Sequence, residues 1–158
     1  MPIRSSTLTS IELRTEAPQK RLLLFGVGGR LCACGLDAVR EIVPARDPTR
    51  LPGAPSWVRG LINLRGTLLT VVSLTVRFGE EISVAQSIIV AEGAGRVLGI
   101  GVDGVRDVRS VTDAELELVD EQRSAGGIVS GLAHIGGARD ELALVCDINA
   151  IVRQALLN

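Results

Sequence analysis

Apolar residues recur along the chain in short runs separated by glycine, proline or polar residues, and this spacing predicts strands more often than long helices. Residues 22–27 and 31–35 are two such runs, joined by Gly28-Gly29. Residues 60–74 form the most pronounced pattern, with two strand-forming runs that meet at Arg65-Gly66. Glycine accepts the positive φ of a tight hairpin turn at little cost, so this stretch is predicted to be a β-hairpin.

Between these runs the spacing changes. Residues 36–43 carry apolar side chains at 36, 39, 42 and 43, which predicts one or two helical turns ending at Pro44. Four prolines mark residues 44–56 as a connecting loop, and residues 55–59 are expected to form a single helical turn that starts at a proline. Capping-box spacing predicts a helical turn at residues 112–115, and a short terminal helix is expected at residues 149–157.

The second half of the chain repeats the first. Residues 22–42 align with residues 88–108 without a gap, and the hairpin recurs, with residues 60–66 matching 131–137. Such a repeat predicts two similar β units of about five strands each, which close into small barrels and leave few bare edges. We expect a flexible tail at residues 1–19 and a domain at residues 20–158. Its two subdomains are expected at about residues 20–80 and 81–158.

Composition narrows the possible functions. Aromatic residues make up only 2% of the chain, so an aliphatic core is expected. The net charge of −1 gives no reason to expect nucleic-acid binding. No apolar run reaches the roughly 20 residues that span a bilayer, and the N-terminus lacks a secretory pattern. Three cysteines without a disulfide-type spacing indicate reduced thiols and a cytoplasmic protein.

The residues with reactive side chains do not form a convincing catalytic or metal site. The obvious metal ligands or nucleophile–base partners are Cys32, Cys34, Cys146 and the single His134. In the repeat, however, Cys32 and Cys34 align with Leu98 and Ile100, which favours burial of both thiols. Glycine-rich stretches match no phosphate-binding loop. We therefore expect no catalytic residue, metal or cofactor. The alternative, a thiol-dependent enzyme, requires a reactive cysteine exposed to solvent.

The repeat also separates what the fold needs from what function needs, because features shared by both halves are expected to be structural. Arg65 aligns with Gly136 and Asn63 with His134, while Trp57 has no evident counterpart. Arg65 is either a solvated turn residue or an anchor at a protein interface, where arginine is enriched.

The stretches 22–25, 36–42 and 51–66, the last with Val-Arg-Gly and Asn-Leu-Arg-Gly, resemble the CheW family of chemotaxis coupling proteins. The resemblance covers about residues 20–155. It departs from the family at Ser73, where aspartate is usual, and at Thr70, where proline is usual.

This resemblance implies a mainly β fold of two SH3-like five-stranded β-barrel subdomains. It also implies a non-catalytic adaptor that couples the cytoplasmic tips of chemoreceptors to the regulatory domain of a CheA-type histidine kinase. Such a protein is cytoplasmic, does not insert into the membrane and is recruited to receptor arrays at its inner face. An alternative is a CheW-like adaptor of a pilus, gliding or other chemosensory-like pathway. The docking residues that the resemblance implies are Val39, Glu41, Gly60, Asn63 and Arg65.

Overall fold

The computed structural model of the chain describes residues 19–136 and 140–157. Within these ranges the chain forms the strands β1 to β11, four short 3-10 helices and the helix α2. The strands of the first half are β1 (Gln19–Val27), β2 (Arg30–Gly35), β3 (Val39–Pro44), β4 (Val58–Leu64) and β5 (Thr67–Ser73). Those of the second half are β6 (Ser87–Gly93), β7 (Arg96–Val102), β8 (Gly104–Thr112), β9 (Leu116–Leu118), β10 (Val129–Gly136) and β11 (Glu141–Cys146). The helices are η1 (Leu36–Ala38), η2 (Val76–Phe78), η3 (Asp113–Glu115), η4 (Glu121–Arg123) and α2 (Ile148–Leu156).

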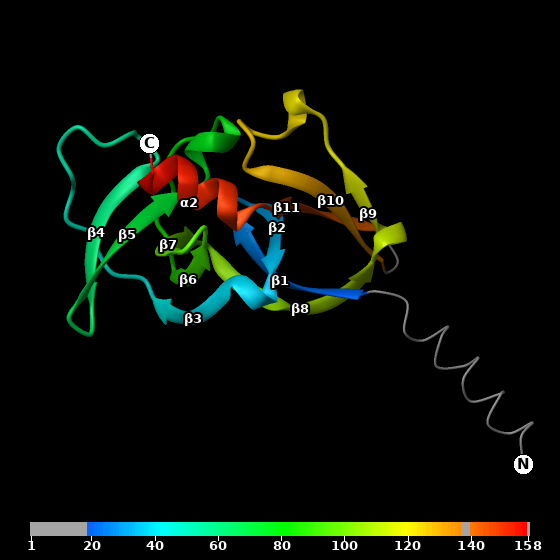
Figure 1. Cartoon of the computed structure of the whole chain (residues 1–158), viewed down its shortest axis with the longest axis horizontal. Coiled ribbons are helices and arrows are strands. Elements are labelled where there is room, and N and C mark those ends of the chain that lie inside the picture. The colour runs from blue at the N-terminus through cyan, green and yellow to red at the C-terminus, as the bar shows by residue number, and fades with distance from the viewer. Residues whose placement is uncertain (1–18, 137–139, 158) are drawn as a thin grey trace, which may run out of the picture.

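The strands form two sheets that lie side by side (Figure 1). One sheet has the order β3-β6-β7-β5-β4 and the other the order β8-β1-β2-β11-β10-β9. Each sheet curls into a small barrel, so the prediction of a mainly β fold with two barrel subdomains is confirmed. The predicted tail lies outside the described residues except for residue 19, which begins β1.

The two halves of the sequence exchange hairpins. The β1–β2 hairpin pairs with β8 and β11, and the repeat-related β6–β7 hairpin pairs with β3 and β5. The predicted boundary at about residue 80 therefore does not separate the two barrels, because strands of both halves enter each sheet. A sequence repeat shows which strands are alike, but it carries no information about which of two similar partners a strand pairs with.

The register of the strand pairing also follows the sequence repeat. Val71 lies opposite Gly99 in the parallel pair of β5 and β7, and the repeat-related Val145 lies opposite Ala33 in the pair of β11 and β2. The edge strands β3 and β8 also carry matching irregularities where they pair with β6 and β1. The chain thus has an internal pseudo-two-fold arrangement, in which β3 and β8 occupy equivalent places.

Two local predictions were wrong. Within the stretch predicted to be helical, only η1 is helical, and residues 39–44 continue as the strand β3. An irregularity in its pairing with β6 disturbs the alternation of the strand, which explains the helix-like spacing of its apolar residues. The predicted helical turn at residues 55–59 is a turn that leads directly into β4. The β4–β5 hairpin, the capping box at Thr112 and the terminal helix are confirmed.

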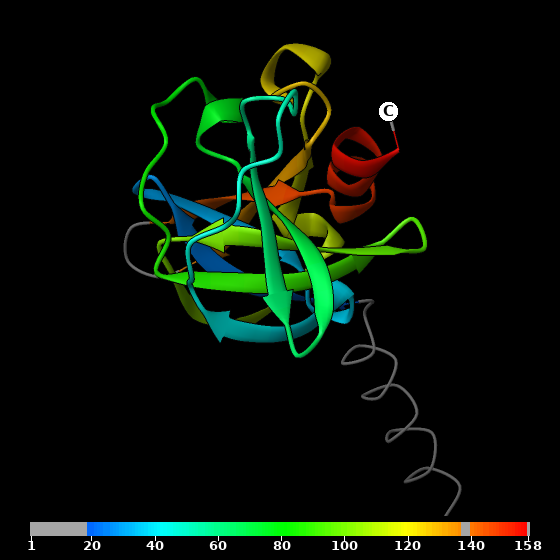
Figure 2. The ribbon, with the colours of Figure 1, turned by 90° about the vertical axis from the view of Figure 1, so that its left-hand side faces the viewer.

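The largest hydrophobic cluster lies between the barrels, and we call it the interbarrel core. It combines side chains from both sheets with the inner face of α2, which crosses above the junction of the sheets (Figure 1) and packs at one side of the molecule (Figure 2). Its members include Leu23, Phe25, Val72, Ile89, Ala91, Ile100, Ile148, Ile151 and Val152. Burial of this aliphatic surface from both sheets and from α2 is what holds the two barrels together.

Trp57, which has no counterpart in the second half of the repeat, is a member of this core. Its side chain is only 5% exposed, and the guanidinium carbon of Arg77 lies 4.7 Å from its ring centroid. Burial lowers the pKa of Arg77, whose Nη2 donates to the carbonyl oxygens of Ala125 and Gly126. Arg77 therefore ties the 3-10 helix after β5 to a loop of the second half.

Candidate functional site

The turn between β4 and β5 holds two of the predicted docking residues in a fixed geometry. Arg65 and Gly66 both have positive φ, 51° and 88°, which fits the two central positions of a tight hairpin turn. The Asn63 Oδ1 atom accepts a hydrogen bond of 2.8 Å from the Gly66 amide. We call residues 63–66 the Arg65 turn. It places an arginine in a backbone conformation that glycine adopts more easily.

An ion pair connects the Arg65 turn to β3. The Arg65 Nη2 atom donates to the Glu41 Oε2 atom, and the two side chains are 67% and 35% exposed. A second contact comes from the loop after β3, where Arg46 Nη1 donates to the Asn63 carbonyl oxygen at 2.9 Å. Exposed ion pairs contribute at most about 1 kcal/mol, so this pair positions charge at the surface more than it stabilises the fold.

Val39 lies at the margin of the interbarrel core, on the same strand as Glu41. Val39 is opposite Ala91 and Ile42 is opposite Ile89 in the pairing of β3 with β6. Residues directly opposite one another in an antiparallel pair project from the same face. Because Ala91 and Ile89 belong to the interbarrel core, Val39 and Ile42 extend that core towards the solvent, and Ile42 is 44% exposed.

The second half contributes an equivalent margin. Val105 is opposite Phe25 and Val108 is opposite Leu23 in the pairing of β8 with β1. Both partners are members of the interbarrel core, and Val108 is 43% exposed. The repeat therefore places apolar side chains on the edge strand of each barrel, beside the interbarrel core. We call the surface formed by Val39, Ile42, Val105 and Val108 the interbarrel groove.

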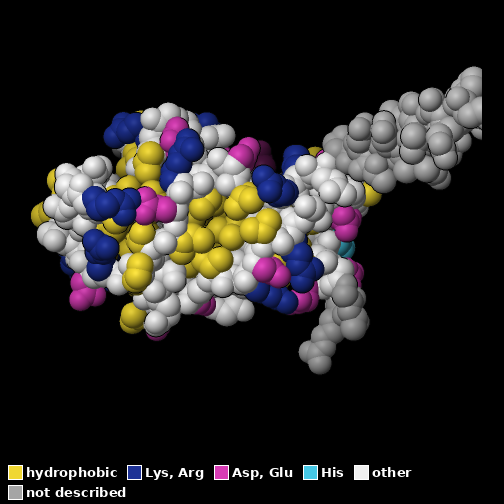
Figure 3. Space-filling view, turned by 90° about the horizontal axis from the view of Figure 1, so that it is seen from below, with side chains coloured by type: hydrophobic (Ala, Val, Ile, Leu, Met, Phe, Trp, Pro, Cys, Tyr) yellow, Lys and Arg dark blue, Asp and Glu magenta, His cyan; other side chains and the backbone are white. Residues whose placement is uncertain are grey.

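The face that carries β3 and β8 has a hydrophobic patch at its centre (Figure 3). Basic and acidic side chains lie around this patch, and some of them touch one another. An apolar strip with a charged rim is the usual composition of a surface that binds another protein.

Gly60 differs from the other predicted docking residues because it is buried. Its φ is 137°, and a Cβ atom there would lie 2.1 Å from the Thr49 carbonyl oxygen. Thr49 and Leu61 exchange two backbone hydrogen bonds of 2.8 Å across this point. Gly60 thus lets the proline-rich loop cross β4, and it supports the Arg65 turn without presenting a side chain to a partner.

Sequence reasoning missed Ile42, Val105, Val108 and Arg46. Ile42 was hidden because residues 36–43 were assigned to a helix, which obscures the faces of a strand. The alignment of Ile42 with Val108 was a usable signal, since two apolar residues recur on edge strands. Nothing in the sequence indicated that Arg46 reaches the Asn63 carbonyl oxygen.

In the described residues of the second half, the ion pair between edge strand and hairpin is built from other residues, because Arg106 of β8 pairs with Glu141 at the start of β11 at 2.9 Å. Asp107, the counterpart of Glu41, pairs instead with Arg109 on its own strand, at 3.3 Å. The counterpart of Asn63 is His134, which lies 3.5 Å from carboxylate oxygens of both Glu117 and Asp140. The two hairpins have equivalent strands, but they present different charged groups at the surface.

The three cysteines are buried and unpaired. Burial, with a smaller contribution from the Asp37 charge, raises the pKa of Cys34 to about 12. A hydrogen bond with Cys32, together with burial, also raises the pKa of Cys146. A neutral, buried thiol is a poor nucleophile. Among the described residues, no group of His, Cys, Asp or Glu side chains is arranged to hold a metal ion.

Ser73, which replaces an aspartate usual in the family, is buried next to Thr75, and their hydroxyl oxygens lie 2.8 Å apart. In the second half Asp147 keeps the aspartate, and its Oδ1 accepts from the Ala150 amide at the start of α2. Ser73 thus contacts the hydroxyl of the residue before the 3-10 helix η2, whereas Asp147 caps α2. In the described part of the chain, no helix has the length and apolar character needed to cross a bilayer.

Comparisons with known proteins agree with this architecture. Residues 21–156 match the family model of the CheW-like domain. The "Chemotaxis protein CheW" of Rhizobium meliloti is 39% identical over 101 residues, which span 62% of this chain and 65% of that protein. The protein of the same name from Klebsiella aerogenes is 28% identical over 91% of this chain and 88% of its own length. The crystal structure of the scaffolding protein TtCheW from Thermoanaerobacter tengcongensis superposes with a TM-score of 0.72 at 25% identity, covering 82% of this chain and 90% of that one.

Proposed function

The chain belongs to the family of CheW-like domains, and from this premise we propose that it is a non-catalytic adaptor in bacterial chemotaxis. It would couple chemoreceptors to a CheA-type histidine kinase from the cytoplasmic side of the membrane, within receptor arrays. The relatives described as chemotaxis and scaffolding proteins support this assignment. The observation that carries it is the interbarrel groove with the Arg65 turn at the neighbouring barrel end.

The groove supplies the binding surface for the receptor tip. An amphipathic helix can lay its apolar side chains along Val39 and Ile42 on one wall and Val105 and Val108 on the other. These four side chains already flank the interbarrel core, so binding extends a packed surface and removes apolar area from water. The kinase regulatory domain would bind a second surface of the chain, which makes the chain a bridge.

The Arg65 turn supplies orientation. Its backbone is held by the Asn63 hydrogen bond, and the Arg65 side chain is held by Glu41, so few conformations are lost when a partner binds. Arginine presents several donors in a planar group, which suits a carboxylate or a carbonyl at the end of a receptor helix. We assign docking contacts to Val39, Glu41, Asn63 and Arg65, and a supporting role to Gly60.

Reconstitution tests this proposal. Purified chain, a receptor cytoplasmic fragment and a CheA-type kinase are combined, and both co-sedimentation and kinase autophosphorylation are measured. The kinase is expected to respond to the receptor fragment only when the chain is added. Arg65→Ala is expected to weaken this response and Arg65→Glu to weaken it further, while the melting temperature is nearly unchanged. Arg109→Ala, which removes the ion pair that Asp107, the counterpart of Glu41, makes within β8, is the control.

Failure of the wild-type chain to form a complex with either partner would contradict the adaptor function. Loss of folding together with binding in Arg65→Ala would instead make Arg65 a structural residue. A response to receptors of pilus or gliding motility, without a response to chemotaxis receptors, would favour the alternative pathway.

A further inference from the structure

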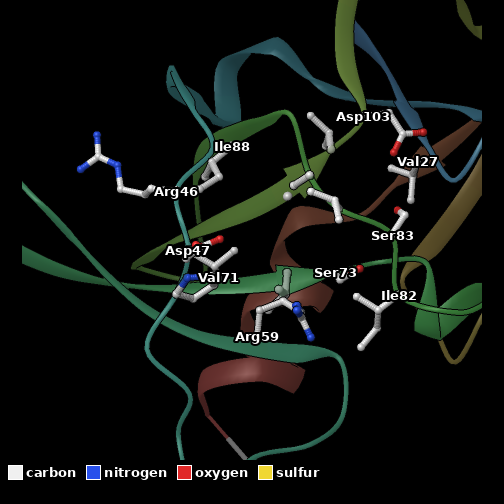
Figure 4. A pocket seen from close by; sticks show the side chains of 16 residues that line it. Val27, Arg46, Asp47, Arg59, Val71, Ser73, Ile82, Ser83, Ile88 and Asp103 are labelled. Carbon is white, nitrogen blue, oxygen red and sulfur yellow. The ribbon is translucent and has the colours of Figure 1, made fainter.

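A cavity of about 230 Å³ lies at the barrel of β3–β7, on neither wall of the interbarrel groove. The loop after β3 and residues 82–85 form its sides, and strands β5, β6 and β7 contribute apolar side chains (Figure 4). Val71 and Ile88 from these strands are both almost fully buried. The volume equals that of roughly eight water molecules at about 30 Å³ each, which is small for a binding site but sufficient for a metabolite of a few carbons.

Arg59 is the unusual residue of this cavity. Among the arginines that the structure describes, it alone is partly buried without a hydrogen bond or ion pair to another side chain or carbonyl. The other arginines have partners or are exposed to water. A guanidinium that lines a cavity without a protein partner is available to bind an anionic group of a ligand. The repeat supports this view, because the counterpart of Arg59 is Ser130, and the fold does not require a cation there.

A carboxylate without a partner lines the same cavity. Asp47 makes no side-chain hydrogen bond or ion pair with any described residue, and it does not lie within ion-pair distance of Arg59. The two remaining charged residues of the lining are already engaged. Arg46 donates to the Asn63 carbonyl oxygen and extends away from the other lining side chains (Figure 4), while Asp103 Oδ2 accepts from the Gly29 amide at 3.0 Å.

The lining therefore has one free cation, one free anion and an apolar wall, within the part of the chain that the structure describes. The formal charges of its four ionisable side chains cancel, so the cavity does not favour a net anion or a net cation. A small zwitterion with an apolar side chain satisfies all three features at once. We propose that this cavity binds a free aliphatic amino acid of about the size of leucine. Its carboxylate would face Arg59, its ammonium group Asp47, and its side chain Val71 and Ile88.

Calorimetric titration of the full chain with L-leucine tests this inference. Saturable binding is expected with one site per chain. Arg59→Gln and Asp47→Asn are each expected to weaken the affinity at least about tenfold, because each removes one charge-assisted hydrogen bond. Arg50→Gln is the matched control, since Arg50 is an unpaired arginine of the neighbouring loop that does not line this cavity. Ala85→Leu, which fills part of the cavity, is expected to abolish binding, with circular dichroism checking that the variant is folded.

Two analogues test the class of ligand. 4-Methylpentanoate lacks the ammonium group of leucine, and 3-methylbutylamine lacks its carboxylate, so each is expected to bind at least about tenfold more weakly than leucine. Equal binding of 4-methylpentanoate and leucine would overturn the role of Asp47 and the zwitterion proposal. Absence of saturable leucine binding, or equal weakening by Arg50→Gln and Arg59→Gln, would overturn the site altogether. Neither result bears on adaptor function, which reconstitution measures separately.

Discussion

The hairpins β4–β5 and β10–β11 are the two copies of one structural unit, and at one matching position they place different residues at a positive φ. In the second copy Gly136 has a φ of 81°, and in the first copy Arg65 has a φ of 51° at the matching position. Glycine is the residue that takes this conformation without strain, whereas arginine takes it at a cost. The fold therefore needs the conformation and not the arginine. A costly residue at a site where the fold accepts glycine indicates a functional demand.

The comparison of the two hairpins also shows that the fold requires a glycine at position 60. Its counterpart Gly131 is also glycine, and a Cβ there would lie 2.7 Å from the Glu117 carbonyl oxygen. Both glycines let a neighbouring segment pair closely with the first strand of the hairpin. The proposed docking surface is thus built on shared glycines and apolar strands, and it gains its specific charges from residues that occur in one copy only.

The largest expected effect tests these glycines. Gly60→Ala is expected to destabilise the fold by about 3 kcal/mol or more, because the new Cβ meets backbone atoms in a left-handed conformation. Gly131→Ala should cost less, about 1–2 kcal/mol, because Gly131 has no positive φ and its closest contact is longer. Urea unfolding followed by circular dichroism gives both values. Equal costs would show that the two crossings are equivalent.

A smaller effect tests the two walls of the interbarrel groove. Ile42→Asp and Val108→Asp are each expected to weaken receptor binding at least about tenfold, because a carboxylate cannot pack against the apolar face of a helix. Stability should change little, since both side chains are more than two-fifths exposed. Titration of a receptor fragment against each variant measures the affinity. An effect confined to one of the two variants would mean that the partner contacts only one barrel.

The cysteines give a further contrast, because Cys32 and Cys34 occupy places that Leu98 and Ile100 fill in the second half. With the pKa of Cys34 near 12, its folded thiol is neutral at pH 8. Alkylation by iodoacetamide, followed by mass spectrometry, should therefore be slow in the native protein and fast in urea. Rapid native labelling would revive the thiol-enzyme reading.

The same raised pKa makes stability depend on pH at the alkaline end. The folded state holds the Cys34 proton more tightly than the unfolded chain does, so its contribution is fully present below the pKa of the unfolded thiol. It is lost as pH rises from there towards 12. Cys34→Ala should reduce the alkaline loss of unfolding free energy. An unchanged pH profile would show that Cys34 is not a source of that loss.

Much of this structure could be predicted from the sequence. The internal repeat revealed two β units, and Gly66 between two strand-forming runs marked a hairpin because glycine accepts the positive φ of its turn. The exchange of hairpins was not predictable, since residues 22–27 and 88–93 offer similar apolar strands to either partner. The strand β3 was missed because an irregularity in the strand imitates the spacing of a helix.

The candidate site also has one part that could be predicted from the sequence and one part that could not. Asn63 and Arg65 stood out because their counterparts differ, and the structure joins them to Glu41 through one turn and one ion pair. The groove depends on which faces of β3 and β8 border the interbarrel core, and this follows only from strand pairing across the two halves. Local sequence therefore identified the charged part of the site, and tertiary pairing supplied the apolar part.

Arg65→Gly tests the central claim most directly, because it gives the first turn the residue that the second turn already has. Receptor affinity is measured by calorimetry and unfolding free energy by urea titration, with Arg109→Ala as the control. The affinity is expected to fall at least about tenfold, while the unfolding free energy is unchanged or rises by up to about 1 kcal/mol. An unchanged affinity, or a fall in stability that parallels the loss of binding, would contradict a docking role for Arg65.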